Sequence, residues 1–164
     1  MTASRIQLEE AGGEDRDICV LIDAARTLVE VSLKEHLRTE PVDLSSPVIQ
    51  QYLRVYLGKR QNEWLYAIFV DSDCCFLKDE MIGLGGRHSV ETRFAHLFRR
   101  AIELRSVGMV LAHNHPSGDC TPGQKDIETT RIIEQTAMRL DLVLHDHLIV
   151  THDKIFSIMQ ERHL

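Results

Sequence analysis

The chain has 164 residues, a length that can bury a hydrophobic core and that favours one domain over several. Its 25 acidic residues outnumber its 19 basic residues, so the formal net charge of -6 gives no general attraction for the phosphate backbone of a nucleic acid. The N-terminal region holds no apolar run long enough for a signal peptide or a membrane span. We therefore expect a cytoplasmic protein without a membrane partner, and the sequence leaves its oligomeric state open.

Helices are predicted in the first part of the chain. Apolar residues recur at helical spacing between Ile18 and Val29, which predicts an amphipathic helix. Further on, Ser46-Pro47 is typical of an N-cap followed by a first helical turn, and Gly58 is typical of a stop. We expect residues 1–45 to form an N-terminal helical extension and residues 46–164 to form the main domain.

Strand and helix patterns follow one another in the middle of the chain. The run Trp64–Val70 is rich in aromatic and β-branched residues, as strands are. Segments 75–78 and 81–84 continue it as a β-meander, which Gly85-Gly86 ends. In segment 94–102, apolar residues fall at i, i+3, i+4, i+7 and i+8, the spacing of a helix that packs on a core. This order predicts a mixed α/β fold.

The most informative segment is the run His113-Asn114-His115-Pro116-Ser117-Gly118. The apolar run Val107–Ala112 before it predicts a buried strand that ends at His113. Because alternate residues of a strand face the same way, His113 and His115 can project to one side while Asn114 points elsewhere.

A helix is predicted to follow this segment. Thr121 suits an N-cap, Pro122 suits the first helical position, and Gln124 stands three residues after Thr121, as in a capping box. A helix that begins near residue 122 places Asp126 in its early turns, close to the end of the strand. A strand over Leu142–Val150 is predicted after this helix.

Two imidazoles and a carboxylate at this spacing can hold one zinc ion, with His113, His115 and Asp126 as ligands. Three protein ligands leave a fourth position for a reactive water, which separates a catalytic zinc from a structural one. A histidine pair alone is a weak signal, because such pairs also occur as ordinary polar residues at strand ends. The capped helix and its aspartate make chance a poor explanation, so the sequence points toward hydrolysis.

The segment AHNHPSGDCTPGQKD resembles the H-x-H-x(10)-D motif of the JAMM (MPN-plus, or JAB) metalloprotease superfamily in its RadC-like form. DHLIV at Asp146–Val150 is similar to the strand that usually follows, and the similarity extends over Ser46 to Ile158. The resemblance implies a JAMM/MPN-like (cytidine-deaminase-like) fold with a central mixed β-sheet flanked by helices. It also implies Zn2+ as the cofactor and a peptide or isopeptide bond in a peptide or protein as the substrate.

By the same resemblance, the superfamily uses a glutamate at the start of a strand upstream of the first histidine. Glu63 stands 50 residues before His113 and opens the run Trp64–Val70. From the residues alone, Glu63 is interpreted as an acid that solvates a strand end. The resemblance instead makes it the catalytic acid and base, which takes a proton from the metal-activated water and then protonates the leaving amine.

One position departs from the family pattern. The family usually has a serine three residues before the aspartate, where the hydroxyl supports the oxyanion, and this chain has Gly123 there. Loss of an oxyanion donor costs about a hundredfold or more in rate, and Ser117 and Thr121 are the residues available to compensate. Gly123 therefore favours an alternative in which the domain is a non-catalytic zinc-binding scaffold.

A further alternative is a role in DNA repair, with weak or no peptidase activity. RadC-like proteins were named for such a role, and longer members carry an N-terminal helix-hairpin-helix module. Residues 1–45 show no glycine-centred hairpin between two short helices, and the letters HNH do not match the dispersed residues of HNH nucleases. DNA as a partner is not supported by the net charge.

Other candidate ligands have ordinary interpretations. His145 and His147 form a second pair on a strand whose half-buried face explains them, so we expect no second metal site. The four cysteines lack a CxxC spacing and are expected to be reduced. Cys120, between the histidines and Asp126, is a weak candidate for a metal ligand or nucleophile.

Overall fold

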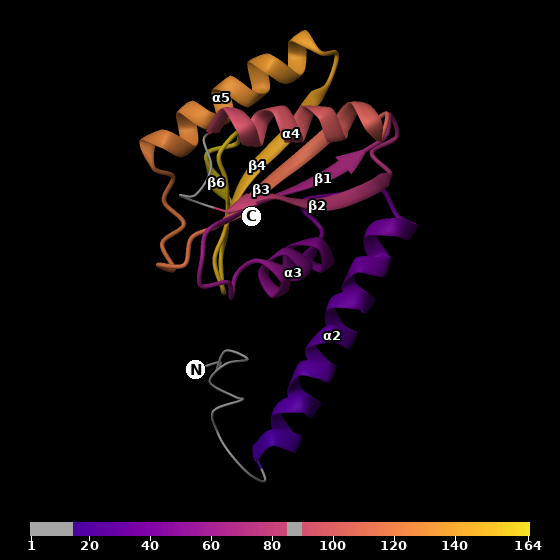
Figure 1. Ribbon diagram of the computed structural model, residues 1–164, viewed down its shortest axis with the longest axis vertical. Helices are drawn as coiled ribbons and strands as arrows, with labels where there is room; N and C mark the ends of the chain where they lie inside the picture. The colour runs from indigo at the N-terminus through magenta and orange to yellow at the C-terminus, as the bar shows by residue number, and fades with distance from the viewer. Residues whose placement is uncertain (1–14, 85–89) are drawn as a thin grey trace.

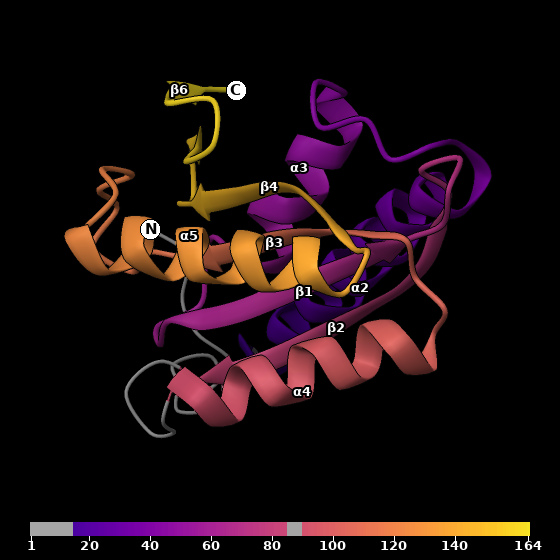
Figure 2. The ribbon, with the colours of Figure 1, turned by 90° about the horizontal axis from the view of Figure 1, so that it is seen from above.

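The computed structural model describes residues 15–84 and 90–164, which form a β-sheet covered by helices on both faces (Figure 1). Helix α3 (Pro47–Tyr56) and the C-terminal end of α2 (Asp15–Thr39) lie on one face. Helices α4 (Val90–Glu103) and α5 (Gln124–Arg139) lie alongside one another over the other face (Figure 2). The strands are β1 (Trp64–Val70), β2 (Phe76–Leu84), β3 (Gly108–Asn114), β4 (Val143–Val150), β5 (Ile155–Ser157) and β6 (Arg162–His163).

The sheet is mixed, with the strand order β2-β1-β3-β4-β5-β6. Strands β3 and β4 are parallel and are joined by α5, whereas the other neighbouring strands are antiparallel. Because β1 runs antiparallel to β3, the beginning of β1 lies beside the end of β3, where Leu65 pairs with His113. One edge of the sheet thereby brings together the segment before β1, the end of β3 and the loop that leads to α5. The predicted mixed α/β fold is confirmed.

The sheet separates two hydrophobic cores. This explains why β1 and β3 are almost continuous apolar runs, since strands buried on both faces have no polar side. The core under α3 contains Tyr52, Leu53, Leu57, Tyr66, Ile68, Val110, Ala112 and Leu148. The core under α4 and α5 contains Leu65, Phe69, Leu97, Ala101, Met109, Leu111, Ile133 and Ala137.

Helix α3 forms as predicted, with Ser46 at the N-cap and Pro47 in the first turn. The chain leaves it through Gly58, and a Cβ atom at this position would lie 2.3 Å from the carbonyl oxygen of Thr151. Only glycine permits this close approach of the backbone that follows α3 to the end of β4. Glycine is therefore required just after the end of α3 because the backbone there packs closely against Thr151.

Helix α2 forms, but its apolar stripe is not buried. Ile18, Leu21, Ile22, Leu28 and Val29 have exposed fractions between 39% and 70%. Its last turns alone reach the body of the protein, where Leu37 is buried and the ammonium of Lys34 lies 2.7 Å from the carboxylate of Asp79. No helix in the described part of the chain is long and apolar enough to cross a membrane.

Two expectations about the middle elements need correction, and a third cannot be compared with the structure. Residues 76–84 form one strand, paired with β1 as a hairpin, and α4 then intervenes before β3, so the chain does not continue as a meander. The apolar face of α4 buries Leu97, Phe98 and Ala101, but Ile102 is exposed. Gly85-Gly86 lies outside the described residues.

Candidate metal centre

The three predicted zinc ligands converge at the carboxyl end of β3. His113 lies within β3, His115 follows the strand, and Asp126 lies in the first turn of α5. The Nε2 atoms of the two histidines are 3.1 Å apart, and each lies near one carboxylate oxygen of Asp126, at 3.5 Å for His113 and 3.6 Å for His115. Within residues 15–84 and 90–164, these three residues are the group of metal-ligating side chains whose donor atoms lie close enough together to hold one ion.

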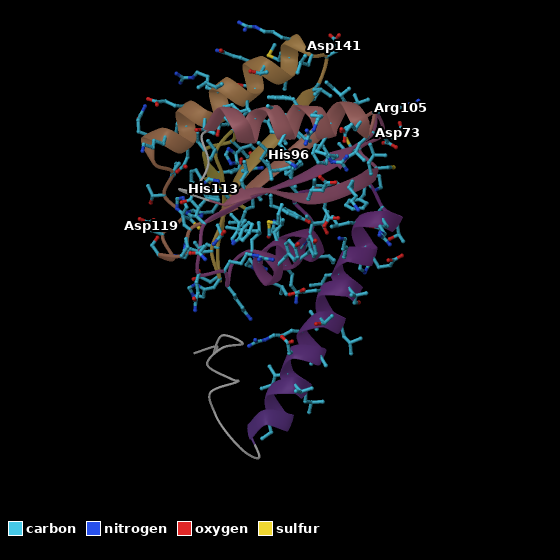
Figure 3. All side chains as sticks on the ribbon, viewed as in Figure 1. Asp73, His96, Arg105, His113, Asp119 and Asp141 are labelled. Carbon is cyan, nitrogen blue, oxygen red and sulfur yellow. The ribbon has the colours of Figure 1, made fainter. Side chains whose placement is uncertain are left out.

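The donor separations fit a tetrahedral metal. Zinc takes imidazole nitrogen and carboxylate oxygen ligands at about 2.0–2.2 Å, which places neighbouring ligand atoms about 3.4 Å apart in a tetrahedron. The three separations of 3.1, 3.5 and 3.6 Å lie around this value. Three ligands of this kind would leave a fourth position for water or substrate. Figure 3 places His113 and Asp119 at one end of the sheet, opposite the end that carries Asp73 and Arg105.

The loop after β3 orients the second histidine. Gly118 has a φ of 83°, in the left-handed region that favours glycine, and its N–H donates to the carbonyl of His115 at 3.1 Å. This turn returns the carbonyl of Asp119 to the His115 ring, with 2.7 Å between that oxygen and Nδ1. Because a carbonyl can only accept, His115 carries its proton on Nδ1 there, and its Nε2 faces the other two residues.

The start of α5 orients the aspartate, and here the predicted helix cap is wrong. The helix begins at Gln124 with Gly123 at the N-cap, so Thr121 and Pro122 precede it. The reason is that the Asp126 carboxylate itself accepts a hydrogen bond from the N–H of Gly123 at 2.8 Å, as the third helical residue does in a capping box. This bond fixes the carboxylate beside the histidines.

A second layer of polar residues lies behind His113, and sequence reasoning missed it. The ring of His147, 2% exposed, has its Nε2 2.9 Å from Nδ1 of His113. Its Nδ1 lies 2.6 Å from the hydroxyl of Thr130 on α5. The two histidines of β4 therefore lie in different surroundings, since His147 is buried behind His113 and His145 is exposed. The available signal was strand alternation, which puts His113 and His147 on the same sheet face once β3 and β4 are known to be neighbours.

Asn114 was also missed as a site residue. Its side chain is 1% exposed and points to the sheet face opposite His113, where all its hydrogen-bonding groups are used. The Oδ1 atom accepts from the N–H of Trp64 at 2.8 Å, and Nδ2 donates to the carbonyls of Arg60 and Asn62 at 3.1 and 3.0 Å. These bonds hold the segment that carries Glu63 against the end of β3.

Glu63 itself is exposed and immediately precedes β1, as predicted. It stands outside the group of three donors but near enough for its charge to contribute to raising the pKa of His115. The predicted acid and the donor group therefore share one edge of the sheet.

At two of the three donors, the electrostatics favour the deprotonated form that a metal needs. Burial lowers the pKa of His113 to about 4. Partial burial alone would raise the pKa of Asp126, but the neighbouring rings of His115 and His113 and the hydrogen bond from the N–H of Gly123 outweigh it and lower this pKa to about 2. The pKa of His115 is raised, mainly by the Asp126 carboxylate, which lies 3.6 Å from its Nε2. Near neutral pH, His113 is neutral and Asp126 is ionised.

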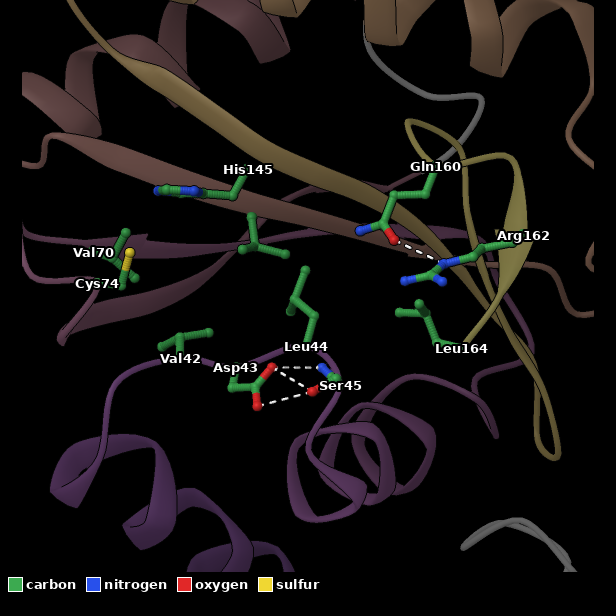
Figure 4. A pocket seen from close by; sticks show the side chains of 11 residues that line it. Val42, Asp43, Leu44, Ser45, Val70, Cys74, His145, Gln160, Arg162 and Leu164 are labelled. Atoms are coloured by element: carbon green, nitrogen blue, oxygen red, sulfur yellow. Dashed lines mark hydrogen bonds between the residues drawn. The ribbon is translucent and has the colours of Figure 1, made fainter.

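Two other features lie apart from the cluster. Cys120 is buried against Ile149 and Ile158, with its thiol 3.6 Å from the hydroxyl of Thr151, and it is not a member of the donor group. A cavity of about 260 Å³ lies on the α3 side of the sheet (Figure 4). Val42, Leu44, Val110, His145 and Arg162 are among its lining residues, and none of the three proposed ligands is.

Comparison with known proteins agrees with this geometry. The sequence model of the RadC-like JAB domain family matches residues 44–164, and the chain belongs to this family. It is 31% identical over 139 residues to a UPF0758 protein of Photobacterium profundum, which covers 83% of this chain and 62% of the relative. It is 29% identical over 161 residues to a UPF0758 protein of Rhodobacter capsulatus, covering 98% of this chain and 75% of the relative. A UPF0758 protein of Acidithiobacillus ferrooxidans is 34% identical over 155 residues, covering 88% and 69%. The chain thus spans less than two thirds of the first of these relatives.

Proposed function

We propose that this protein is a zinc-dependent hydrolase of peptide or isopeptide bonds, with His113, His115 and Asp126 as ligands and Glu63 as the catalytic acid and base. The observation that carries the proposal is the convergence of two imidazoles and a carboxylate at separations that suit a tetrahedral ion, with His113 neutral and Asp126 ionised near neutral pH. Membership of the RadC-like JAB family supports it.

The chemistry assigns each residue a separate task. Bound zinc would act as a Lewis acid and bring the pKa of a water molecule to about 7. Glu63, exposed at the start of β1, would take the proton from that water and deliver it to the leaving amine. Asn114 would keep the segment around Glu63 in place through the three hydrogen bonds of its side chain.

A non-catalytic zinc-binding scaffold is the second candidate, because Gly123 supplies no hydroxyl where the family usually has serine. A role on DNA gains less support. The guanidinium of Arg100 pairs with Glu80 and Glu103, and that of Arg99 lies 3.7 Å from Glu103, so these two cations of α4 are already neutralised by carboxylates.

Metal analysis tests the ligands first. The wild-type protein, stripped and reloaded with zinc, is expected to hold stoichiometric metal, whereas His113→Ala and Asp126→Ala are expected to lose it. His145→Ala is the matched control, because it removes an exposed histidine of β4 outside the donor group. Equal zinc content in all four proteins would reject the assignment.

Hydrolysis assays then separate the enzyme from the scaffold. On panels of peptides and isopeptides, the zinc-loaded wild type is expected to turn over substrate, and Glu63→Gln is expected to keep its zinc and lose that activity. A wild type that is fully loaded and inactive on every panel would favour the scaffold instead.

A further inference from the structure

We propose that Thr130 and His147 set the tautomer of His113, so that the lone pair of its Nε2 atom points toward His115 and Asp126. Both are positioning residues in this proposal, because they act through His113. The expected effect on zinc affinity rests on the proposed function, in which His113 binds the metal. The positions of the protons follow from hydrogen bonds within the protein alone.

The chain of hydrogen bonds begins at the backbone of Asp126. The hydroxyl of Thr130 lies 2.6 Å from the carbonyl oxygen of Asp126, one turn earlier in α5. A carbonyl can only accept, so the single hydroxyl proton of Thr130 is directed to it. The oxygen of Thr130 is then left as an acceptor for its second close neighbour, Nδ1 of His147 at 2.6 Å.

The second step fixes the proton of His147. Because Thr130 accepts, Nδ1 of His147 must carry the hydrogen. The Nε2 atom of the same ring lies 2.9 Å from Nδ1 of His113, a distance at which one proton is shared between two nitrogens. A second proton on His147 would place an imidazolium in a site that is 2% exposed and that offers it a hydroxyl and another imidazole as hydrogen-bond partners. His147 is therefore the acceptor at Nε2.

The third step fixes His113. Since Nε2 of His147 accepts, Nδ1 of His113 carries the proton, and Nε2 of His113 presents its lone pair on the side of the other two proposed ligands. In His115, the carbonyl of Asp119 holds a proton on Nδ1, so Nε2 is the atom of this ring that faces the other two residues. Both histidines thus turn Nε2 toward Asp126. His147 on β4 orients the ring of His113, and the loop carbonyl of Asp119 orients the ring of His115.

The arrangement also links the ligands to one another. The hydroxyl of Thr130 is hydrogen-bonded to the backbone carbonyl of the proposed ligand Asp126 and to the ring of His147. The ring of His147 is in turn hydrogen-bonded to the ring of the proposed ligand His113. Outer partners of this kind typically change metal affinity by about 10–100-fold when they are removed. The effect expected from Thr130 is therefore on zinc affinity, although its hydroxyl touches none of the three donor atoms.

Nitrogen NMR of the histidine side chains in the metal-free protein tests the proton positions directly. Both His113 and His147 are expected as Nδ1–H tautomers in the wild type. In Thr130→Val, whose side chain has the same shape without the hydroxyl, both rings are expected to show a mixture with the Nε2–H form. A wild-type His113 that carries its proton on Nε2 would overturn the proposal, whether or not the protein binds zinc.

Zinc affinity, measured by competition with a chelator, tests the consequence. Thr130→Val is expected to bind zinc about 10–100-fold more weakly than wild type, and Thr130→Ser is expected to recover most of the loss. The matched control is Thr136→Val, because Thr136 makes the same bond to the carbonyl four residues earlier in α5, at 2.8 Å, without contacting a histidine. Affinity in Thr130→Val equal to that in Thr136→Val would overturn the proposal. A wild type without zinc affinity would reject the proposed ligands, and the NMR result would then decide on the tautomers alone.

Discussion

The side chain of Asn114 accepts a hydrogen bond from the backbone N–H of Trp64 at 2.8 Å, which joins the end of β3 to the beginning of β1 across 50 residues of sequence. The same side chain donates to the carbonyls of Arg60 and Asn62. Glu63 lies between the residues that Asn114 holds, so one buried amide on one face of the sheet determines where the proposed catalytic acid stands relative to the cluster at the same edge.

Asn114→Asp is expected to separate metal binding from activity. The new carboxylate can still accept from Trp64, but it would face the carbonyls of Arg60 and Asn62 without a donor, and the resulting repulsion would displace the segment around Glu63. A displacement of this kind can cost about a hundredfold in rate. We expect a large loss of hydrolysis with zinc content unchanged, measured on the same preparation. Full turnover in this variant would show that the clamp does not position Glu63.

Gly123→Ser tests the departure from the family pattern. The backbone at Gly123 has φ -74° and ψ 161°, which any residue adopts, and an added Cβ would lie 3.2 Å from an oxygen of Asp126. The carboxylate must therefore yield by a few tenths of an ångström in any substituted variant, and Gly123→Ala controls for that shift. If the hydroxyl supports the oxyanion, the serine variant should exceed the alanine variant in turnover by about a hundredfold at equal zinc content. Equal rates would show that a hydroxyl at this position adds nothing.

Zinc is expected to stabilise the fold. A ligand that binds the native state alone raises the free energy of unfolding by about 2.7 kcal/mol at a free concentration of 100 times Kd. For a domain of this size, each kcal/mol shifts Tm by about 2–4 °C, so zinc should raise Tm by about 5–10 °C over a sample in chelator. Thermal unfolding with and without zinc measures this shift, and His113→Ala should show none. A shift of the same size in that variant would mean that the metal binds elsewhere.

Asp79 is expected to make stability depend on pH. Burial alone would raise the pKa of Asp79, but hydrogen bonds from Lys34, Tyr66 and Tyr52 outweigh it and lower this pKa. Because the folded value is below the unfolded value of about 3.9, the carboxylate's stabilisation is complete above the unfolded pKa and is lost as pH falls through the folded pKa.

The test compares wild type with Asp79→Asn by urea unfolding. The variant should be less stable by about 2 kcal/mol at pH 7, the typical contribution of hydrogen bonds to a charged group. That difference should persist at about pH 5 and shrink from about pH 4 downward, where the wild-type carboxylate loses its charge. Asp73→Asn, at an exposed position, is the matched control and should stay within about 0.5 kcal/mol of wild type. A difference that does not change with pH would contradict the role of the charge.

Local patterns were sufficient for much of the fold. The apolar run from Trp64 to Val70 is a strand with those bounds, and the strand predicted over 142–150 begins one residue later, at Val143. The histidines two apart and the aspartate in the following helix come together as the spacing predicted, because only one short loop separates the end of β3 from α5. Such features depend on residues close in sequence, and periodicity describes them well.

The tertiary structure decided what surrounds those residues. Nothing in the periodicity of β4 indicates that it lies parallel to β3, and this pairing is what places His147 behind His113. The cap of α5 moved from Thr121 to Gly123 because the Asp126 carboxylate turned back onto the backbone, and the apolar stripe of α2 stayed exposed because only its last turns meet the sheet. The sequence by itself therefore determined helices α2 to α5, strands β1, β3 and β4 and the candidate donor set, through short-range geometry. Their proton positions and the support for Glu63 depend on hydrogen bonds between segments far apart in the chain, which only strand pairing and packing create.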